Sequence, residues 1–380
     1  MDTELLTNVA EMENQDSEQP EVKATDRFPC PQCAADMAFD PITQALTCSY
    51  CGHQVTIDCE AGEAKEYDLA EGERLCSTDW GRVTNVIQCE SCGARTVLEQ
   101  SGTADSCSFC GSSHVVKVDE LPGIKPESLI PFQVSADGAK QSFAKWIGGR
   151  FFAPGDLKSA HQAKQLRGMY IPFWTYDTDT YSAYHAEKGT HYWVTVPVTV
   201  TRNGKTTVEH RQEMRTRWRP VSGTFAHFYD DELIHASERL DSILAGSFGQ
   251  YDLSKLVEYK PEYLSGFAAE RYSIDLKQGW ERAKQAIKQK ISGGIVRQIN
   301  GDAVRSLQFT SSFERVTFKH LLLPLWISSY TYKGKLYRFL VNGQTGEVHG
   351  EAPVSALKVT ICVALGLAAA ALIFYLLNNQ

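Results

Sequence analysis

The chain carries a long uninterrupted run of apolar residues near its C-terminal end. Residues 359–377 number nineteen and include no charged side chain. As a helix this run is about 28 Å long, close to the roughly 30 Å hydrocarbon core of a bilayer. A helix that packs on a soluble core shows a polar stripe, and this run shows none. The pattern predicts a transmembrane helix at 356–377, and a tail anchor because only three polar residues follow it.

The large middle segment, 119–355, alternates between helical and strand-like patterns, and its second half resembles its first. Each half runs from a strand to a helix and then to a strand-rich segment. These segments are 129–134, 136–149 and 168–185 in the first half, and 268–275, 277–291 and 321–350 in the second. The local match is YIPFW at 170–174 against LLPLW at 322–326. We therefore expect an α+β domain with two related halves, each pairing one helix with an antiparallel sheet.

Alternation of polar and apolar residues within 191–218 indicates strand structure. The alternation predicts a long β-hairpin that turns at Asn203 and Gly204. The aromatic residues of the domain alternate with polar ones, so we expect them in the core or on a sheet face. A ligand cage built from them stays an alternative.

Eight of the eleven cysteines form two sets with the same spacing. In each set a Cys-x2-Cys pair is followed after fourteen residues by another pair, and the second set lies 59 residues after the first. The sets are Cys30, Cys33, Cys48 and Cys51, and Cys89, Cys92, Cys107 and Cys110. Four thiolates complete a tetrahedron around Zn²⁺ at about 2.3 Å. The repeat predicts two small zinc ribbons, at 27–58 and 86–118, and two Zn²⁺ per chain.

A site with four thiolate ligands has no open coordination position, so we expect these sites to be structural and to supply the ribbons' folding energy. The alternatives are disulfide pairs, scattered thiols, or iron in place of zinc. The N-terminal residues show no secretory signal, which favours a reducing cytoplasm and metal over disulfides. Cys59 and Cys76 lie outside the repeat, and the sequence assigns them no role; a redox role stays open.

The charge of the ribbons indicates whether they bind protein or nucleic acid. The chain has a net charge of -8, residues 1–26 read as a disordered acidic arm, and 59–85 as an acidic linker or short helix. Neither ribbon carries a cluster of lysine or arginine. Because nonspecific affinity for nucleic acid comes from such clusters, we expect the ribbons to contact proteins. Nucleic-acid binding is the alternative.

Two segments resemble catalytic motifs. Gly204, Lys205 and Thr206 look like the end of a phosphate-binding loop, but residue 199 is threonine where that loop requires glycine. Asp230, Asp231, Glu232 and His235 form the densest cluster of acids and histidine. Such a cluster can bind metal or transfer protons. Capping of a helix over 232–244 by Asp230 or Asp231 is simpler. We therefore expect no enzyme, and a hydrolase built on this cluster is a third hypothesis.

Several longer motifs together carry a resemblance to a known family. They are CPQC…CSYCGH, CESCGA…CSFCGS, GMYIPFWTYD, HLLLPLW, YRFLVNGQTGEVHGEAP and the apolar tail. The chain resembles a bacterial family of double-zinc-ribbon, C-terminally membrane-anchored proteins, often labelled transcription-factor-IIB-type zinc-ribbon proteins. Some members are labelled primosomal protein N-prime or replication-restart helicase, which the missing Walker motif does not support. The resemblance implies that the eight cysteines bind metal. It also implies partners among flotillin/stomatin-like (SPFH) or phage-shock-type membrane proteins.

These observations lead to one expected function. The chain should be a non-enzymatic adaptor in the inner membrane, with a single membrane pass and its N-terminal bulk in the cytoplasm. The orientation follows from the cluster Lys333, Lys335, Arg338 and Lys358 before the apolar run, since cytoplasmic flanks are rich in lysine and arginine. The adaptor would recruit a protein partner through its zinc ribbons.

Overall fold

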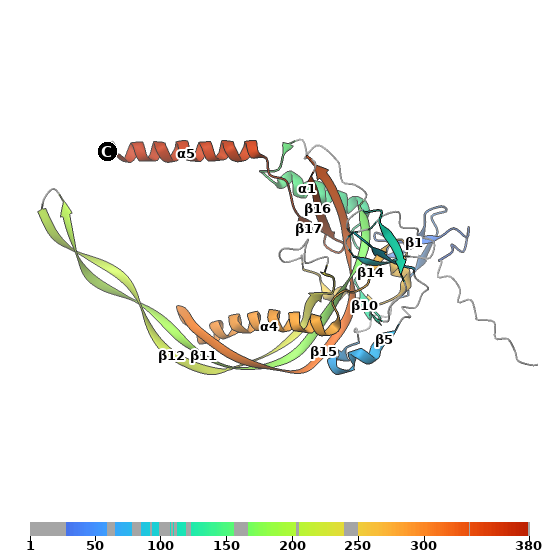
Figure 1. The fold of residues 1–380 in the computed structure, drawn as a ribbon, viewed down its shortest axis with the longest axis horizontal. Helices are drawn as coiled ribbons and strands as arrows, with labels where there is room; N and C mark the ends of the chain where they lie inside the picture. Colours follow the sequence, from blue (N-terminus) through green and yellow to red (C-terminus); the bar gives the residue numbers. More distant parts are fainter. Residues whose placement is uncertain are drawn as a thin grey trace, which may run out of the picture.

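A computed structural model of the chain describes residues 28–58, 65–77, 85–91, 93–98, 107, 109, 112–118, 123–155, 166–202, 205–238, 250–333 and 335–378. The acidic arm expected at 1–26 lies outside these residues. The helices are α1 (Ala136–Gly149), α4 (Leu276–Ile299) and α5 (Ala356–Asn378), with 3₁₀ turns η1 (Leu69–Leu75), η2 (Leu253–Lys255) and η3 (Pro261–Leu264). They accompany a large sheet-rich body (Figure 1), so the expected α+β class is confirmed.

The strands are β1 (Met37–Asp40), β2 (Ala45–Cys48), β3 (Gln54–Thr56), β4 (Tyr67–Asp68), β5 (Cys76–Ser77), β6 (Asn85–Cys89), β7 (Arg95–Leu98), β8 (Val115–Val118), β9 (Gly123–Ile124), β10 (Ser128–Leu129), β11 (Arg167–Arg202), β12 (Lys205–His235), β13 (Val257–Glu258), β14 (Ala268–Glu270), β15 (Ala303–Tyr332), β16 (Lys335–Asn342) and β17 (Val348–Gly350).

Three very long strands form the spine of the body. β11 is central and pairs antiparallel with β12 on one side and with β15 on the other. The pairing of β11 with β12 ends at Arg202 and Lys205, so the predicted hairpin is confirmed, while the turn residues Asn203 and Gly204 lie outside the described residues. β15 begins opposite Gly189. Beyond that point β11 and β12 continue as a two-stranded ribbon, 190–202 and 205–217, which we call the arm (Figure 1).

Helix α4 covers the concave face of these strands (Figure 1). Its first turn is capped by the Asp275 carboxylate, which accepts from the backbone N–H of Gln278. Ile287, Ile291 and Ile295 recur every four residues and are fully buried, as the core-facing stripe of an amphipathic helix requires. The helix predicted at 277–291 is thus confirmed, and it extends one residue earlier and eight residues further.

The shorter helix α1 lies against the opposite end of the sheet. The Ser135 hydroxyl caps it by accepting from the backbone N–H of Gly138. Phe143 stacks on Phe339 of β16 with ring centroids 3.8 Å apart. The helix predicted at 136–149 has these bounds in the structure.

Helix α5 leaves the body alone (Figure 1). Its residues 356–376 have a mean hydropathy of 2.5 and bury no part of the span inside the protein. By length and composition α5 is able to cross a membrane, which agrees with the apolar helix predicted at 356–377. At its start the Lys358 ammonium donates to the backbone oxygens of Phe151 (3.1 Å) and Ala153 (2.7 Å), which ties α5 to the loop after α1.

Strands of the segments before the α+β domain pair with strands of that domain. β4, in the acidic segment 59–85, pairs with β15, and β5 pairs with β9. β7, between the two cysteine pairs of the second set, pairs with β14. The cysteine-rich segments are therefore built against the body.

Candidate metal centre

The backbone of the first cysteine set folds each Cys-x2-Cys pair into a tight turn. The N–H of Cys30 donates to the carbonyl of Ala35, and the N–H of Cys48 donates to the carbonyl of His53, five residues on in both cases. Ala34 and Gly52 have φ of 58° and 75°, the left-handed region that closes such turns. The antiparallel pairing of β1 with β2 then brings the two turns together.

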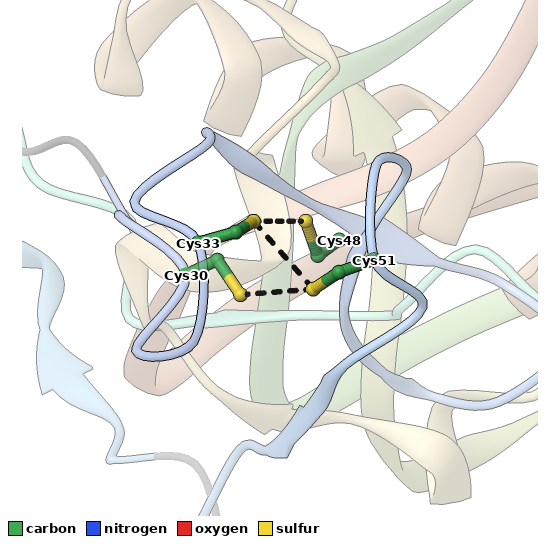
Figure 2. A group of neighbouring side chains, drawn as sticks. All are labelled: Cys30, Cys33, Cys48 and Cys51. Atoms are coloured by element: carbon green, nitrogen blue, oxygen red, sulfur yellow. Dashed lines mark hydrogen bonds between the residues drawn. The ribbon is translucent and has the colours of Figure 1, made fainter.

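The four thiols of this set converge on one point (Figure 2). The Sγ atom of Cys51 lies 3.4 Å from that of Cys30 and 3.5 Å from that of Cys33, and Cys33 lies 3.5 Å from Cys48. Ligands 2.3 Å from a tetrahedral ion are about 3.8 Å apart, whereas a disulfide requires about 2.05 Å. The geometry therefore fits a four-thiolate ion site, and the group is able to hold a zinc ion.

The titration of the thiols shows why a cation fits this group. Backbone N–H donation from Cys51 and Tyr50 outweighs burial and lowers the pKa of Cys48 to about 6. Backbone donation from Ala35 lowers the pKa of Cys33, but burial and the neighbouring thiols outweigh it and raise this pKa to about 12. One thiolate thus forms readily at Cys48, while Cys33 keeps its proton. A divalent cation removes this competition by stabilising all four thiolates.

The first ribbon shares the core of the body. Met37, Phe39 and Leu46 are each 4% exposed and belong to one apolar cluster with residues of the α+β domain. The Phe39 ring meets Tyr263 edge-on at 5.2 Å, and the hydroxyl of Ser265 donates to the carbonyl of Met37 at 2.8 Å. The ribbon therefore docks on the body through buried apolar and hydrogen-bonded contacts.

The second cysteine set is described only in part. Cys89 and Cys107 are buried, while Cys92 and Cys110 lie outside the described residues. The backbone repeats the turns of the first set, since the N–H of Cys89 donates to Ala94 and that of Cys107 donates to Ser112. Of the cysteines outside the repeat, Cys76 is exposed on β5 and Cys362 is on α5, and Cys59 lies outside the described residues.

The acidic cluster is not a helix cap, and that prediction is wrong. Residues 232–235 continue β12 and pair with β11. Their backbone groups therefore form hydrogen bonds across the sheet and not within a helix. Asp230 and Asp231 lie at an irregularity of this ladder, where Asp231 has φ of 49°. His235 is four strand residues beyond Asp231, and its Nδ1 lies 3.0 Å from the carbonyl oxygen of Ser237.

The structure instead brings Asp230 and Asp231 next to Asp177, with a lysine from another strand beside Asp231. Carboxylate oxygens of Asp177, Asp230 and Asp231 all lie within 4.8 Å of one another. Lys319 of β15 is 2.8 Å from Asp231 and 3.1 Å from Glu66. Burial, opposed by the Asp231 N–H and by Lys319, raises the pKa of Asp177 to about 6. Sequence reasoning missed Lys319 and Glu66, because only strand pairing brings them to this cluster.

Comparison with known proteins gives one informative relative. No family model matches the chain, and no solved structure matches it. Among curated proteins, the uncharacterized protein YdjG of Bacillus subtilis (strain 168) is 31% identical over 340 residues, which cover 87% of this chain and 91% of YdjG. The chain belongs to the YdjG family. The name of YdjG assigns no activity.

Proposed function

We propose that this member of the YdjG family is a membrane-anchored adaptor whose cysteine ribbons recruit a protein partner. The observation that carries the proposal is the joining of two features in one body. A closed four-thiolate group is docked on the body, and an apolar helix with no buried span leaves the same body. A closed site leaves no open position for a substrate, which supports a structural metal.

The anchoring part of the proposal assigns α5 to the inner membrane as a tail anchor. Its length matches the hydrocarbon core, and Lys358 marks its first turn. Lysine and arginine before the span, including Lys333 and Arg338, favour a cytoplasmic body by the positive-inside rule. The ribbons would then face cytoplasmic partners.

The metal part of the proposal assigns one Zn²⁺ to each cysteine set. For the first set the converging Sγ atoms support it. For Cys89, Cys92, Cys107 and Cys110 the support is the shared spacing and the repeated turn hydrogen bonds at Cys89 and Cys107. Elemental analysis of the purified chain under reducing conditions should give about two zinc per chain. A value near zero would overturn the ribbon assignment.

We also propose that the two halves of the α+β domain are related copies. Ile171 and Leu323, which are equivalent in the matched YIPFW and LLPLW segments, pair directly across β11 and β15. The Trp174 indole donates to the carbonyl of Ile274 at 3.0 Å, and the Trp326 indole donates to that of Val134 at 2.9 Å. Each acceptor directly precedes the N-cap of a helix, which a two-fold repeat explains.

The adaptor proposal includes no catalytic step. The clustered carboxylates have a cation already, because Lys319 forms ion pairs with Asp231 and Glu66. His235 lies apart from them along β12. A hydrolase would need these groups to meet in one site.

Partner capture tests the proposal. Crosslinking in intact cells, detergent solubilisation and mass spectrometry should recover a flotillin/stomatin-like or phage-shock-type membrane protein, the classes that the family resemblance implies. Substitution of Cys30 and Cys48 by serine should abolish recovery, and Cys76→Ser, at an exposed cysteine outside the group, should preserve it. Recovery of replication proteins with bound nucleic acid would instead support the alternative function.

A further inference from the structure

The arm receives little support from the rest of the described fold. β11 has 36 residues and β12 has 31, and β15 stops pairing with β11 at Gly189. Outward from there the two strands pair only with each other within the part of the chain that the structure describes. A two-stranded ribbon without a packed face is marginally stable in water. Such an arm is expected to gain stability from a partner surface.

One face at the base of the arm carries four cations, which we call the basic patch. In the register of the hairpin Lys188 lies opposite Arg219, and Tyr192 lies opposite Arg215. Arg217 shares their face, because residues two apart on a strand point the same way. Like charges directly across a ladder destabilise it. Repulsion within the basic patch therefore destabilises the pairing of β11 with β12 at the base of the arm.

The basic patch is poorly neutralised within the protein. Arg215 lies 3.5 Å from Glu213, and within the described residues Lys188 and Arg219 make no ion pair. Lys188 lies beside Gly301, just past the C-terminal end of α4, where a cation is favourable. Arg217 lies farther out along the arm, so the C-terminal end of α4 does not account for its positive charge. The patch stands out because the whole chain has a net charge of -8.

A hollow of about 230 Å³ lies at the patch and is lined by Thr190, Tyr192, Arg217 and Arg219. The Arg217 guanidinium lies over the Tyr192 ring, 5.2 Å from its centroid, which fixes the guanidinium in place. Planar guanidinium groups bind phosphate oxygens in pairs, and hydroxyls of threonine and tyrosine add donors. The hollow therefore has the chemistry of a phosphate site.

The geometry points to anionic phospholipid headgroups as the ligand of the basic patch. This inference rests on the proposed function, because α5 brings the bilayer to the protein. The patch continues the face of β11 and β12 that packs on α4, because Ala186 and Val221, two residues before Lys188 and after Arg219, belong to the apolar cluster around that helix. Helix α5 leaves the body on this concave side and runs in the direction of the arm (Figure 1). A tethered patch meets lipid at high effective concentration.

Amide exchange of the full-length chain in lipid nanodiscs tests the inference. The two nanodiscs contain phosphatidylcholine alone or phosphatidylcholine mixed with phosphatidylglycerol. Each near-surface cation raises affinity for an anionic leaflet roughly fivefold. Amides of the arm should therefore exchange at least about tenfold more slowly with phosphatidylglycerol present, and added salt should remove the difference. The triple variant Arg215→Glu, Arg217→Glu and Arg219→Glu should show no slowing in either lipid.

A matched control reverses the same number of charges elsewhere. Lys145, Lys255 and Lys288 are exposed, lie off the arm, and should leave the slowing intact when replaced by glutamate. Alkaline carbonate extraction of each sample reports insertion of α5 independently, so failure of the anchor is distinguishable from failure of the patch.

Three results would overturn the inference. Equal exchange in both lipids shows that anionic headgroups do not bind. Slowing only on addition of single-stranded DNA shows a nucleic-acid site. Slowing that depends on protein concentration in either lipid shows that two copies of the chain cover the arm.

Discussion

Replacement of Cys48 by serine should release the metal of the first ribbon and undock this ribbon while the rest of the fold persists. Cys48 is 1% exposed, and its Sγ lies 3.5 Å from that of Cys33. Three thiolates no longer close the tetrahedron, and a neutral hydroxyl is a much weaker zinc ligand. The apolar cluster around α4 contains no residue of this ribbon, so its stability should not depend on the metal.

The size of the effect follows from what holds the ribbon on the body. Met37, Phe39 and Leu46 are buried at the junction. At the lower value of about 1.5 kcal/mol per buried side chain, they contribute about 4.5 kcal/mol of docking free energy. This equals roughly three orders of magnitude in the opening equilibrium that amide exchange reports. Amides of β1 and β2 should exchange faster by about that factor, and amides of α4 should not change.

The assay combines elemental analysis with hydrogen–deuterium exchange of the detergent-solubilised chain. Cys48→Ser should lose about one zinc per chain, by the four-ligand stoichiometry of one site. Cys76→Ser removes an exposed thiol outside the group and should keep both the metal and the protection of β1. Loss of protection in α4 together with β1 would refute the reasoning, because the metal would then hold the whole fold. Unchanged protection of β1 after loss of the metal would also refute it, because docking of the ribbon would then not depend on the metal.

Three further predictions concern the body. Gly279→Ala should destabilise the chain by about 1–3 kcal/mol in urea unfolding, because the added Cβ meets the Tyr176 hydroxyl. Gly293 lies on an open face of the same helix, so Gly293→Ala should stabilise the chain by about 0.5–1 kcal/mol. Burial lowers the pKa of His320 from 6.5 to about 4. Between pH 6.5 and 4 the imidazole of His320 is protonated in the unfolded chain and neutral in the folded chain, so the free energy of unfolding should fall by up to about 3 kcal/mol as the pH drops through this range. His320→Gln should reduce this loss in unfolding curves measured across the same range. Trp326→Phe removes a buried indole donor and should cost about 1–3 kcal/mol in the same unfolding assay.

Features set by local covalent spacing could be predicted from the sequence. The Cys-x2-Cys turns close over a few residues, so their spacing was enough to group Cys30, Cys33, Cys48 and Cys51. The apolar run of α5 and the alternation in the hairpin are likewise properties of continuous segments.

Features set by contacts between distant segments could not be predicted. The pattern after Asp231 fits a capped helix as well as a strand, and pairing with β11 decided in favour of the strand. Pairing of β11 with β15 brings Lys319 to Asp177 from about 140 residues along the chain. Docking of the first ribbon depends on Phe39 meeting Tyr263, a contact that no local pattern encodes.

Membrane recruitment of the captured partner tests the central claim most directly. Cells would carry the full-length chain, a chain that lacks residues 356–380, or the variant Cys30→Ser with Cys48→Ser, and the partner would be quantified in membrane and cytosolic fractions. The adaptor account predicts membrane-bound partner only with the full-length chain, a soluble partner–chain complex without α5, and no complex in the cysteine variant. A partner distribution that is the same in all three strains, or a chain that stays in the membrane pellet without α5, would contradict it.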